Sequence, residues 1–209
     1  MSTLLVLASA SPRRIDMLRR AEVPHAVLPV DIDETPAAGE SAESLVERLS
    51  RAKADAAALR ADENAPILAA DTMVVATPQT HPTLLGKPPH EGAARQMLLL
   101  LSGATHHVLT GYHLRYFDPV QGTLCRRSRT VATEVDVRTL LGDELSGYLR
   151  SEEWRGKAGA YALQGRFSCF VTAIRGSYEN VVGLPLCSVL QDLRSAELLP
   201  KDWPVWSQK

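Results

Sequence analysis

The segment ILAADTMVVA, residues 67–76, is an apolar run that only Asp71 and Thr72 interrupt. Its length and apolar character predict a buried strand. A carboxylate inside such a strand is costly to bury without a partner, and aspartate is generally disfavoured in strands. Three explanations remain open for Asp71: it ends the strand at a cleft, it pairs with a buried cation, or it binds a metal or acts as a base.

Helices and strands are predicted on both sides of this segment. Before it, the pattern predicts a strand, a helix, a strand and a helix at residues 4–8, 13–21, 27–30 and 41–60. After it, the pattern predicts a helix at 91–101, paired strands at 107–117 and 129–137, a helix at 143–150, a strand at 167–174 and a final helix beginning at 186–193. Strands that alternate with helices and then form hairpins favour an α/β fold, a mixed twisted sheet with flanking helices. Residues 1–209 show no internal repeat or linker and are predicted to form one domain that ends in a loosely tied tail.

The composition argues against several classes of protein. The chain has 209 residues and a formal net charge of -1, with no long run of one sign, so nucleic-acid binding is not expected. The three cysteines are far apart and form no CxxC pair, which argues against a disulfide framework or a structural zinc site. The apolar run near the N-terminus is too short for a signal peptide, and no stretch reaches the length of a membrane span. The chain is therefore predicted to be cytoplasmic.

The sequence SASPRR, residues 9–14, connects the first predicted strand to the first predicted helix. Ser11 is a favourable N-cap, and Pro12 suits the first helical position. The free N–H groups at such a helix start, with Arg13 and Arg14 beside them, suit an anion such as phosphate. Cations at this end of a helix are unfavourable unless an anion compensates them. The alternative is a capped helix with two solvated arginines.

Lys53 lies on the inward side of the helix predicted at 41–60. It follows Leu45 and Leu49 at a spacing of four residues, which places all three on one face of the helix. Two interpretations remain open. Lys53 is either a lysine whose charged end reaches solvent at the rim of the core, or a cation that faces the same cleft as Asp71.

An acidic loop precedes that helix and contains Asp31, Asp33 and Glu34. Carboxylates of this kind are hard oxygen ligands, which suit a divalent metal. A solvated acidic loop without a metal is the more common structure for such a stretch. The loop therefore offers Glu34 as a candidate ligand and leaves the plain surface loop as the alternative.

Two glycine-containing loops carry further candidate ligands. Lys87 lies in the sequence GKP, where the glycine permits a close approach of the backbone to a ligand and the proline stiffens the loop. Gln164 lies in KAGAYALQG, residues 157–165, and its amide offers both an acceptor and donors. Tyr161 in the same segment offers a ring for stacking. The sequence contains no HExxH or GxSxG motif, and no side chain is predicted to act as a covalent nucleophile.

Taken together, these segments resemble the Maf family, also called septum formation inhibitor proteins, which are nucleoside triphosphate pyrophosphatases. The matching stretches are LASASPRR (7–14), DE (33–34), LSRAKADA (49–56), AADTMVV (69–75), LLGKP (84–88), LLSGATHHVLTG (100–111), KAGAYALQG (157–165) and IRGSYENVVGLPL (174–186). Each match is modest, but all of them follow the family's order across nearly the whole chain, which makes the resemblance specific.

The resemblance implies a fold related to the inosine-triphosphate pyrophosphatases, with two lobes around a central cleft. It implies hydrolysis of a nucleoside triphosphate to the monophosphate and pyrophosphate, with a divalent metal, Mg or Mn. Asp71 is implied as the central catalytic carboxylate, with catalytic roles for Lys53 and Glu34 and metal ligation by Asp71 and Glu34. The substrate-binding residues that the resemblance implies are Ser9, Arg13, Arg14, Lys87 and Gln164.

The chain looks like the branch of the family that prefers dTTP and UTP. It has Thr72 after Asp71 and the KAGAYALQG segment, whereas the branch resembling 7-methyl-GTP hydrolases has Gln after the Asp and lacks that segment. The loop TPQTHPT (77–83) is longer than usual and RFSCFV (166–171) is more polar, which affects the rim of the predicted cleft. The rival interpretation is a nucleotide-binding regulator of cell division or septum formation without turnover. A homodimer is the family expectation.

Overall fold

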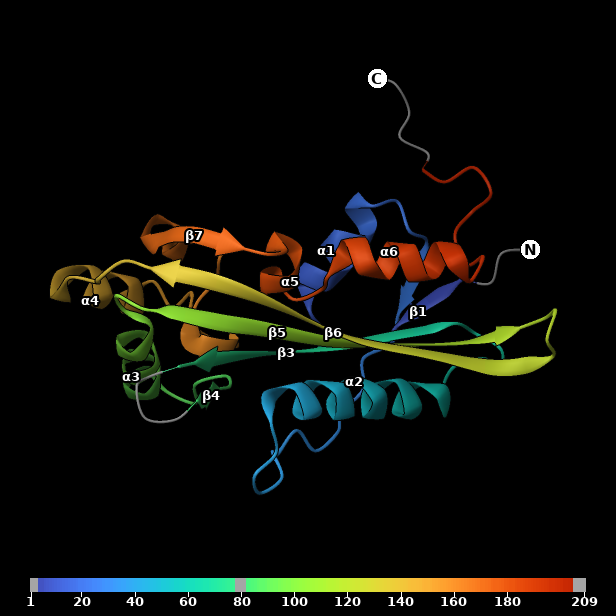
Figure 1. Cartoon of the computed structure of the whole chain (residues 1–209), viewed down its shortest axis with the longest axis horizontal. Helices are drawn as coiled ribbons and strands as arrows, with labels where there is room; N and C mark the ends of the chain where they lie inside the picture. Colours follow the sequence, from blue (N-terminus) through green and yellow to red (C-terminus); the bar gives the residue numbers. More distant parts are fainter. Residues whose placement is uncertain (1–3, 78–81, 205–209) are drawn as a thin grey trace. The chain divides into compact units, whose positions relative to one another are not determined.

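The protein is described by a computed structural model that covers residues 4–77 and 82–204 (Figure 1). Within these residues, seven strands form one mixed sheet in the order β2-β1-β3-β5-β6-β7, with β4 paired to β3. The strands are β1 (Leu5–Leu7), β2 (His25–Val27), β3 (Ile67–Ala76), β4 (Thr83–Leu85), β5 (Thr105–Asp118), β6 (Thr123–Val137) and β7 (Val171–Arg175). β1 pairs in parallel with β2 and β3, whereas β3–β4 and β6–β7 are antiparallel. The prediction of an α/β fold with a mixed sheet and flanking helices is confirmed.

The contacts of the chain divide it into two compact units, which are described separately below. Unit 1 comprises Met1–Asp71, Gly111–Thr130 and Gly183–Lys209, and unit 2 comprises Thr72–Thr110 and Val131–Val182. Strands β3, β5 and β6 each contribute residues to both units. The organisation of the chain as one domain with two lobes around a cleft stays a prediction.

In unit 1, helix α2 (Ala42–Ala58) and helix α6 (Leu186–Ser195) lie on opposite faces of the sheet (Figure 1). Two consecutive residues of β5, which point to opposite faces, explain this arrangement. A Cβ atom at Gly111 would lie 2.6 Å from the carbonyl oxygen of Val46, so the backbone of α2 rests directly on the strand. On the other face, Tyr112 donates its hydroxyl hydrogen bond to the buried carboxylate of Asp192 in α6 at 2.6 Å. Arg129 donates to the same carboxylate at 2.6 Å.

The two N-terminal helices of unit 1 begin where the sequence predicts. Helix α1 (Pro12–Arg20) has Ser11 as its N-cap residue and Pro12 in its first turn, but the Ser11 side chain makes no capping hydrogen bond. Helix α2 begins after Ser41, whose hydroxyl accepts a hydrogen bond from the backbone N–H of Ser44 at 3.2 Å. Toward its C-terminal end, the buried face of α2 carries the small residues Ala54 and Ala57, which pack against residues of β1 and β3.

Unit 2 has its own apolar core. Helices α3 (Glu91–Leu101), α4 (Gly142–Arg150) and α5 (Tyr178–Val182) and the short 3-10 helices η1 (Ala158–Ala160) and η2 (Arg166–Phe170) belong to it. Helix α3 contacts both α4 and η1. Buried side chains from β3, α3, β6, α4 and the segments that follow α4 share this core, among them Val74, Leu98, Val135, Leu149, Trp154 and Phe167. As predicted, α3 ends at Leu101, and Gly103 shortly after it has a φ of +69°, which suits glycine beyond a helix end.

The predicted strand at residues 167–174 is wrong over its first half. Residues Arg166–Phe170 form η2, and β7 begins only at Val171. The ring of Phe167 is fully buried and lies 4.7 Å from the ring of Tyr161, centroid to centroid. The Gly165 carbonyl closes the turn by accepting hydrogen bonds from the backbone and the hydroxyl of Ser168. Local alternation of residue types contains no signal for this aromatic contact.

The predicted strand at 27–30 is displaced toward the N-terminus in the structure. β2 spans His25–Val27, because its register places His25 opposite Leu5 and Val27 opposite Leu7. Pro29 has no backbone N–H to continue the ladder. Part of the predicted loop at 77–83 and the end of the predicted tail at 200–209 lie outside the described residues. Within the described part of the tail, Trp203 donates its indole N–H to the carbonyl of Ala21 at 2.8 Å.

His106 is fully buried in unit 2, as expected if it and its neighbour His107 face opposite sides of β5. Its Nε2 atom lies 2.9 Å from the Tyr161 hydroxyl, and its Nδ1 atom has no hydrogen-bond partner within the described part of the chain. Burial lowers the pKa of His106 from 6.5 to about 4, and the charge of His107 acts in the same direction.

This depressed pKa predicts how stability depends on pH. As the pH falls below 6.5, the unfolded chain binds a proton at His106 before the folded chain does. The free energy of unfolding is therefore expected to fall between pH 6.5 and about 4, with a slope of up to about 1.4 kcal/mol per pH unit from this residue. Urea unfolding across this range should show a flatter dependence for His106→Gln. His107→Gln, at the adjacent half-buried histidine, should keep most of the wild-type slope, because burial contributes more to the lowered pKa of His106 than the charge of His107 does. Equal slopes for all three proteins would contradict the assignment.

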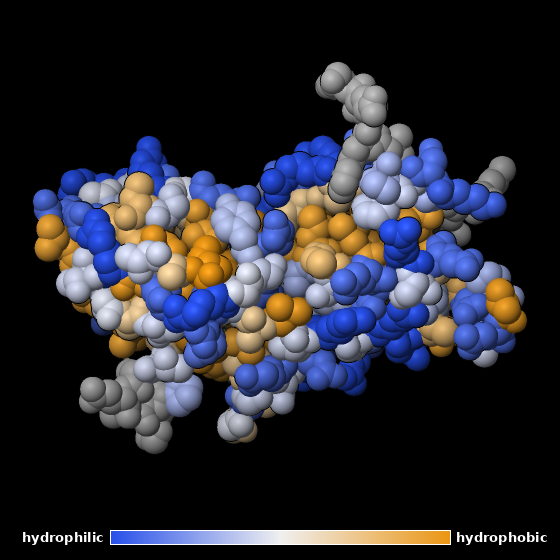
Figure 2. Space-filling view, turned by 45° about the horizontal axis from the view of Figure 1, so that its top comes forward, coloured by the Kyte–Doolittle hydropathy of each residue, from blue (hydrophilic) through white to orange (hydrophobic). Residues whose placement is uncertain are grey.

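The surface matches the balanced composition. Figure 2 shows hydrophobic patches that are interrupted by hydrophilic side chains over the face in view. Among the described residues, no helix is long and apolar enough to cross a membrane. The described cysteines Cys125, Cys169 and Cys187 are free thiols, and the last two are exposed.

Candidate active site

Lys53 joins the two carboxylates that the sequence singled out. Its Nζ atom lies 2.6 Å from Oδ1 of Asp71 and 2.6 Å from Oε1 of Glu34, and all three residues belong to unit 1. Only 8% of Lys53 is exposed, so it is the buried cation of the α2 stripe and not a lysine at the rim of the core. Of the explanations left open for Asp71, pairing with a buried cation is confirmed.

Asp71 is the last residue of β3 that belongs to unit 1, and it is itself only 8% exposed. The residues before it, from Ile67 to Ala70, are fully buried, so the apolar run carries the carboxylate to the edge of the unit 1 core. A buried carboxylate requires a partner of opposite charge, which Lys53 provides. The sequence therefore places both members of this ion pair by apolar patterning, one on a strand and one on a helix.

The acidic loop contributes one of its three carboxylates to this cluster. Glu34 contacts Lys53, whereas Asp33 accepts a hydrogen bond from the backbone N–H of Thr35 at 2.9 Å. Hydrogen bonds from the side chain and the backbone of Thr35 lower the pKa of Asp33. Over residues 4–77 and 82–204, no group of three or more His, Cys, Asp or Glu side chains is arranged to hold a metal ion. The two carboxylates on Lys53 are thus the candidate metal ligands in unit 1.

The turn between β1 and α1 places Ser9, Arg13 and Arg14 in unit 1 as well. The Ser9 hydroxyl accepts a hydrogen bond from the backbone N–H of Ser11 at 3.2 Å and another from Arg14 at 3.1 Å. Arg14 is 8% exposed and Arg13 is half-buried, so the two neighbouring arginines have different surroundings. Burial lowers the pKa of Arg13. The alternative of a capped helix with two solvated arginines therefore does not describe this turn.

The remaining two predicted ligands, Lys87 and Gln164, belong to unit 2, and both side chains are exposed. Their loops are bonded to each other, because the backbone N–H of Gly159 donates to the carbonyl of Gly86 at 3.1 Å. Gly159 has a φ of +66°, and a Cβ atom there would lie 2.9 Å from a methyl group of Val74. Only glycine fits this position, which explains the glycine in KAGAYALQG. The position of these two residues relative to Asp71 stays a prediction.

A chain of polar groups behind Thr72 was missed by sequence reasoning. The Thr72 hydroxyl lies 2.9 Å from the Thr110 hydroxyl, which donates its own proton to the carbonyl of Asn180 at 3.1 Å. Thr110 has a single hydroxyl proton, so Thr72 is the donor in the first of these bonds. The amide of buried Asn180 donates to the Val108 carbonyl at 2.9 Å and to the Thr133 hydroxyl at 3.0 Å. The available signal was Asn180 itself, a polar residue within the matching segment 174–186.

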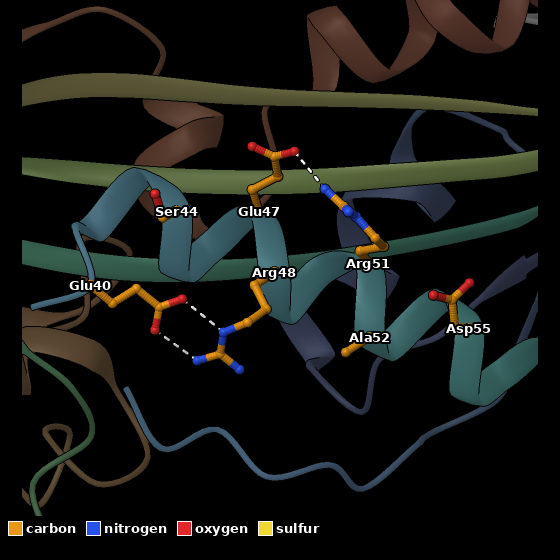
Figure 3. A pocket seen from close by; sticks show the side chains of 7 residues that line it. All are labelled: Glu40, Ser44, Glu47, Arg48, Arg51, Ala52 and Asp55. Atoms are coloured by element: carbon orange, nitrogen blue, oxygen red, sulfur yellow. Dashed lines mark hydrogen bonds and ion pairs between the residues drawn. The ribbon is translucent and has the colours of Figure 1, made fainter. Parts of the chain in front are cut away.

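A pocket on the surface of unit 1 lies along the solvent side of α2 (Figure 3). Four of its charged side chains form two pairs: Arg48 with Glu40 at 2.7 and 2.8 Å, and Arg51 with Glu47 at 2.8 Å. Lys53 instead lies on the buried stripe of the same helix. The pocket is therefore separate from the lysine–carboxylate cluster, and its lining is Glu40, Ser44, Glu47, Arg48, Arg51, Ala52 and Asp55.

The chain belongs to the Maf family, because the family described as Maf-like protein matches residues 4–196. Curated relatives agree with this over most of the chain. A protein from Geobacter sulfurreducens named dTTP/UTP pyrophosphatase is 44% identical over 190 residues, which cover 91% of this chain and 95% of the relative. A protein of the same name from Myxococcus xanthus is 46% identical over 201 residues and 96% of each chain.

Among solved structures, a nucleoside-triphosphatase (dITP/XTP pyrophosphatase) from Mycobacterium abscessus aligns over 91% of this chain and 96% of its own. The sequence identity is 14% and the TM-score is 0.41. A likeness at this level does not establish a shared fold. The predicted relation to inosine-triphosphate pyrophosphatases therefore remains an expectation from the family resemblance.

Proposed function

We propose that this protein hydrolyses nucleoside triphosphates, dTTP and UTP foremost, to the monophosphate and pyrophosphate. The observation that carries the proposal is the cluster in which buried Lys53 bridges buried Asp71 and the more exposed Glu34, at 2.6 Å each. The family membership and the names of relatives at 44% and 46% identity support the substrate class. A regulator that binds nucleotide without turnover is not favoured, since these relatives are named as enzymes.

The side chains of the cluster suit attack by water on the α-phosphorus. Such chemistry depends on positioning and on neutralising the charge of the phosphates, and it needs no nucleophilic side chain. In this mechanism Asp71 accepts a proton from the attacking water, and Lys53 fixes the orientation of both carboxylates. Arg13 and Ser9 bind phosphate oxygens at the helix start. Lys87 and Gln164 are proposed substrate ligands on the family resemblance.

A divalent metal is implied by the family, and the cluster offers it two neighbouring carboxylates. The oxygens of Asp71 and Glu34 converge on a single atom, Nζ of Lys53, so the two carboxylates are close enough to share a cation. Mg²⁺ in phosphate-processing sites is usually held by one or two carboxylates together with substrate phosphates and waters. The bound metal would neutralise phosphate charge and lower the pKa of a bound water. Mg and Mn both suit this set of oxygen ligands.

A panel of nucleoside triphosphates with Mg or Mn tests the proposal directly. We expect dTTP and UTP to give monophosphate and pyrophosphate in equal amounts, because cleavage falls between the α- and β-phosphates. Release of inorganic phosphate together with the nucleoside diphosphate would instead mean that water attacks the γ-phosphorus, which contradicts the proposal. Tight binding of dTTP with no product would support the alternative, a regulator that binds nucleotide without turnover. The expected cytoplasmic location and homodimer need separate measurements, by cell fractionation and by light scattering.

A further inference from the structure

Arg13 and Arg14 are neighbours in sequence, yet only Arg14 is nearly closed to solvent. Its guanidinium donates from Nε to the carbonyl of Gly183 at 2.7 Å and from Nη1 to the carbonyl of Ala70 at 2.7 Å. Nη1 also donates to the hydroxyl of Ser9 at 3.1 Å. These donors are therefore directed at groups of the protein itself, all of them in unit 1.

The three acceptors lie at places that matter for the cluster. Ala70 immediately precedes Asp71 in β3, so the bonded carbonyl belongs to the peptide unit that leads into the aspartate. Ser9 lies in the turn between β1 and α1, where its hydroxyl also holds the Ser11 backbone N–H. Gly183 begins the segment that leads to α6. One side chain thus ties together three segments that are distant in sequence.

Compensating charge for Arg14 also comes from the protein. A cation in the first turn of a helix is unfavourable unless an anion compensates it. Burial lowers the pKa of Arg14, whereas the negative charges of Asp71 and Glu34 act in the opposite direction. The placement of Arg14 at the helix start is therefore explained without a bound phosphate.

We propose that Arg14 is a positioning residue that fixes the backbone next to Asp71, and that Arg13 alone of the pair contacts the phosphates. This inference rests on the proposed function, and it revises the expectation that both arginines face the substrate. The forked guanidinium is essential to this role, because it directs several donors in fixed directions. Lysine keeps the charge but presents a single nitrogen at the end of a flexible chain. Its three donors share one atom, so it cannot reproduce the hydrogen bonds that Arg14 makes from two separate nitrogens, Nε and Nη1.

Steady-state kinetics with dTTP separates positioning from phosphate binding. Arg14→Lys is expected to lower kcat by about 30- to 100-fold, since a misplacement of about 1 Å costs this much. Its KM should change by less than about threefold, because no contact to the substrate is lost. The matched variant Arg13→Lys should instead raise KM by about tenfold or more and keep most of kcat. A raised KM with unchanged kcat in Arg14→Lys would overturn the proposal.

A measurement on the wild-type protein covers the case in which Arg14→Lys does not fold. The Nε–H resonances of the two arginines can be followed by ¹⁵N NMR while a non-hydrolysable dTTP analogue is added. We expect the Arg14 resonance to exchange slowly with solvent before nucleotide is added and to shift little afterwards, while the Arg13 resonance shifts. A shift that is larger for Arg14 overturns the inference. Wild-type protein that neither binds nor hydrolyses dTTP would instead refute the proposed function.

Discussion

Asp71→Asn is expected to lower kcat for dTTP hydrolysis by about 10³-fold or more. Asparagine keeps the shape of the side chain and an oxygen that can accept from Lys53, which lies 2.6 Å from Oδ1. It removes the negative charge that accepts a proton and attracts a metal, and proton transfer alone accounts for about 10² to 10⁴ in rate. Initial rates of pyrophosphate release with Mg or Mn would measure the effect.

Two comparisons make this prediction specific. Calorimetry with a non-hydrolysable dTTP analogue should show an affinity within about threefold of wild type in the absence of metal. The reason is that the lost carboxylate acts on the attacking water and makes no contact with the nucleobase. Asp55→Asn alters an exposed carboxylate on α2, the helix that also carries Lys53, and should leave the rate unchanged. Wild-type turnover by Asp71→Asn with metal present would remove Asp71 from the catalytic role.

Lys53→Met is expected to lower the free energy of unfolding by about 3 kcal/mol and to abolish turnover. The side chains of Lys53 and Asp71 are each 11% exposed, so removing the cation leaves a buried carboxylate without its partner. Breaking a buried ion pair in this way costs about 3–5 kcal/mol. Glu34 adds little to the loss, because 43% of its side chain is exposed and water can solvate it. Urea unfolding followed by circular dichroism would measure the change.

The control lies on the same helix. Arg51 pairs with Glu47 at 2.8 Å on the exposed side of α2, so Arg51→Met should cost less than about 0.5 kcal/mol. The double variant Lys53→Met with Asp71→Asn should recover a substantial part of the lost stability, because the amide at position 71 carries no charge and needs no buried cation. A cost for Lys53→Met no larger than that for Arg51→Met would show that the buried pair contributes little.

Local patterns predicted the elements whose structure is decided locally. The apolar run at 67–76 and the helix at 91–101 have the bounds that the sequence indicated. The start of the helix predicted at 41–60 was likewise visible, because the Ser41 cap depends on residues within one turn. The errors at 27–30 and 167–174 arose where a partner distant in sequence decides the structure. The partner is strand β1 in the first case and a buried aromatic cluster in the second.

The same distinction holds for the candidate site. Lys53 could be predicted, because its position on the apolar stripe of a helix is a periodic signal. The role of Arg14 could not, because two of its acceptors are backbone carbonyls 56 and 169 residues away, which have no signature in the sequence. Thr72 was visible only as an interruption of a strand, since its partner Thr110 lies 38 residues away.

Gly111 affects how closely the position of Lys53 relative to Asp71 is fixed. Where a helix rests on a strand through side chains, its height can change when those side chains change their rotamers. At Gly111 the contact is between main-chain atoms, so the height of α2 at Val46 is set by atoms that are identical in every amino acid. Lys53 follows Val46 by about two turns, or about 10 Å along the axis, on the same side of the helix. The depth at which its ammonium group meets Asp71 is therefore held to a narrow tolerance by the absence of one carbon atom from the sheet.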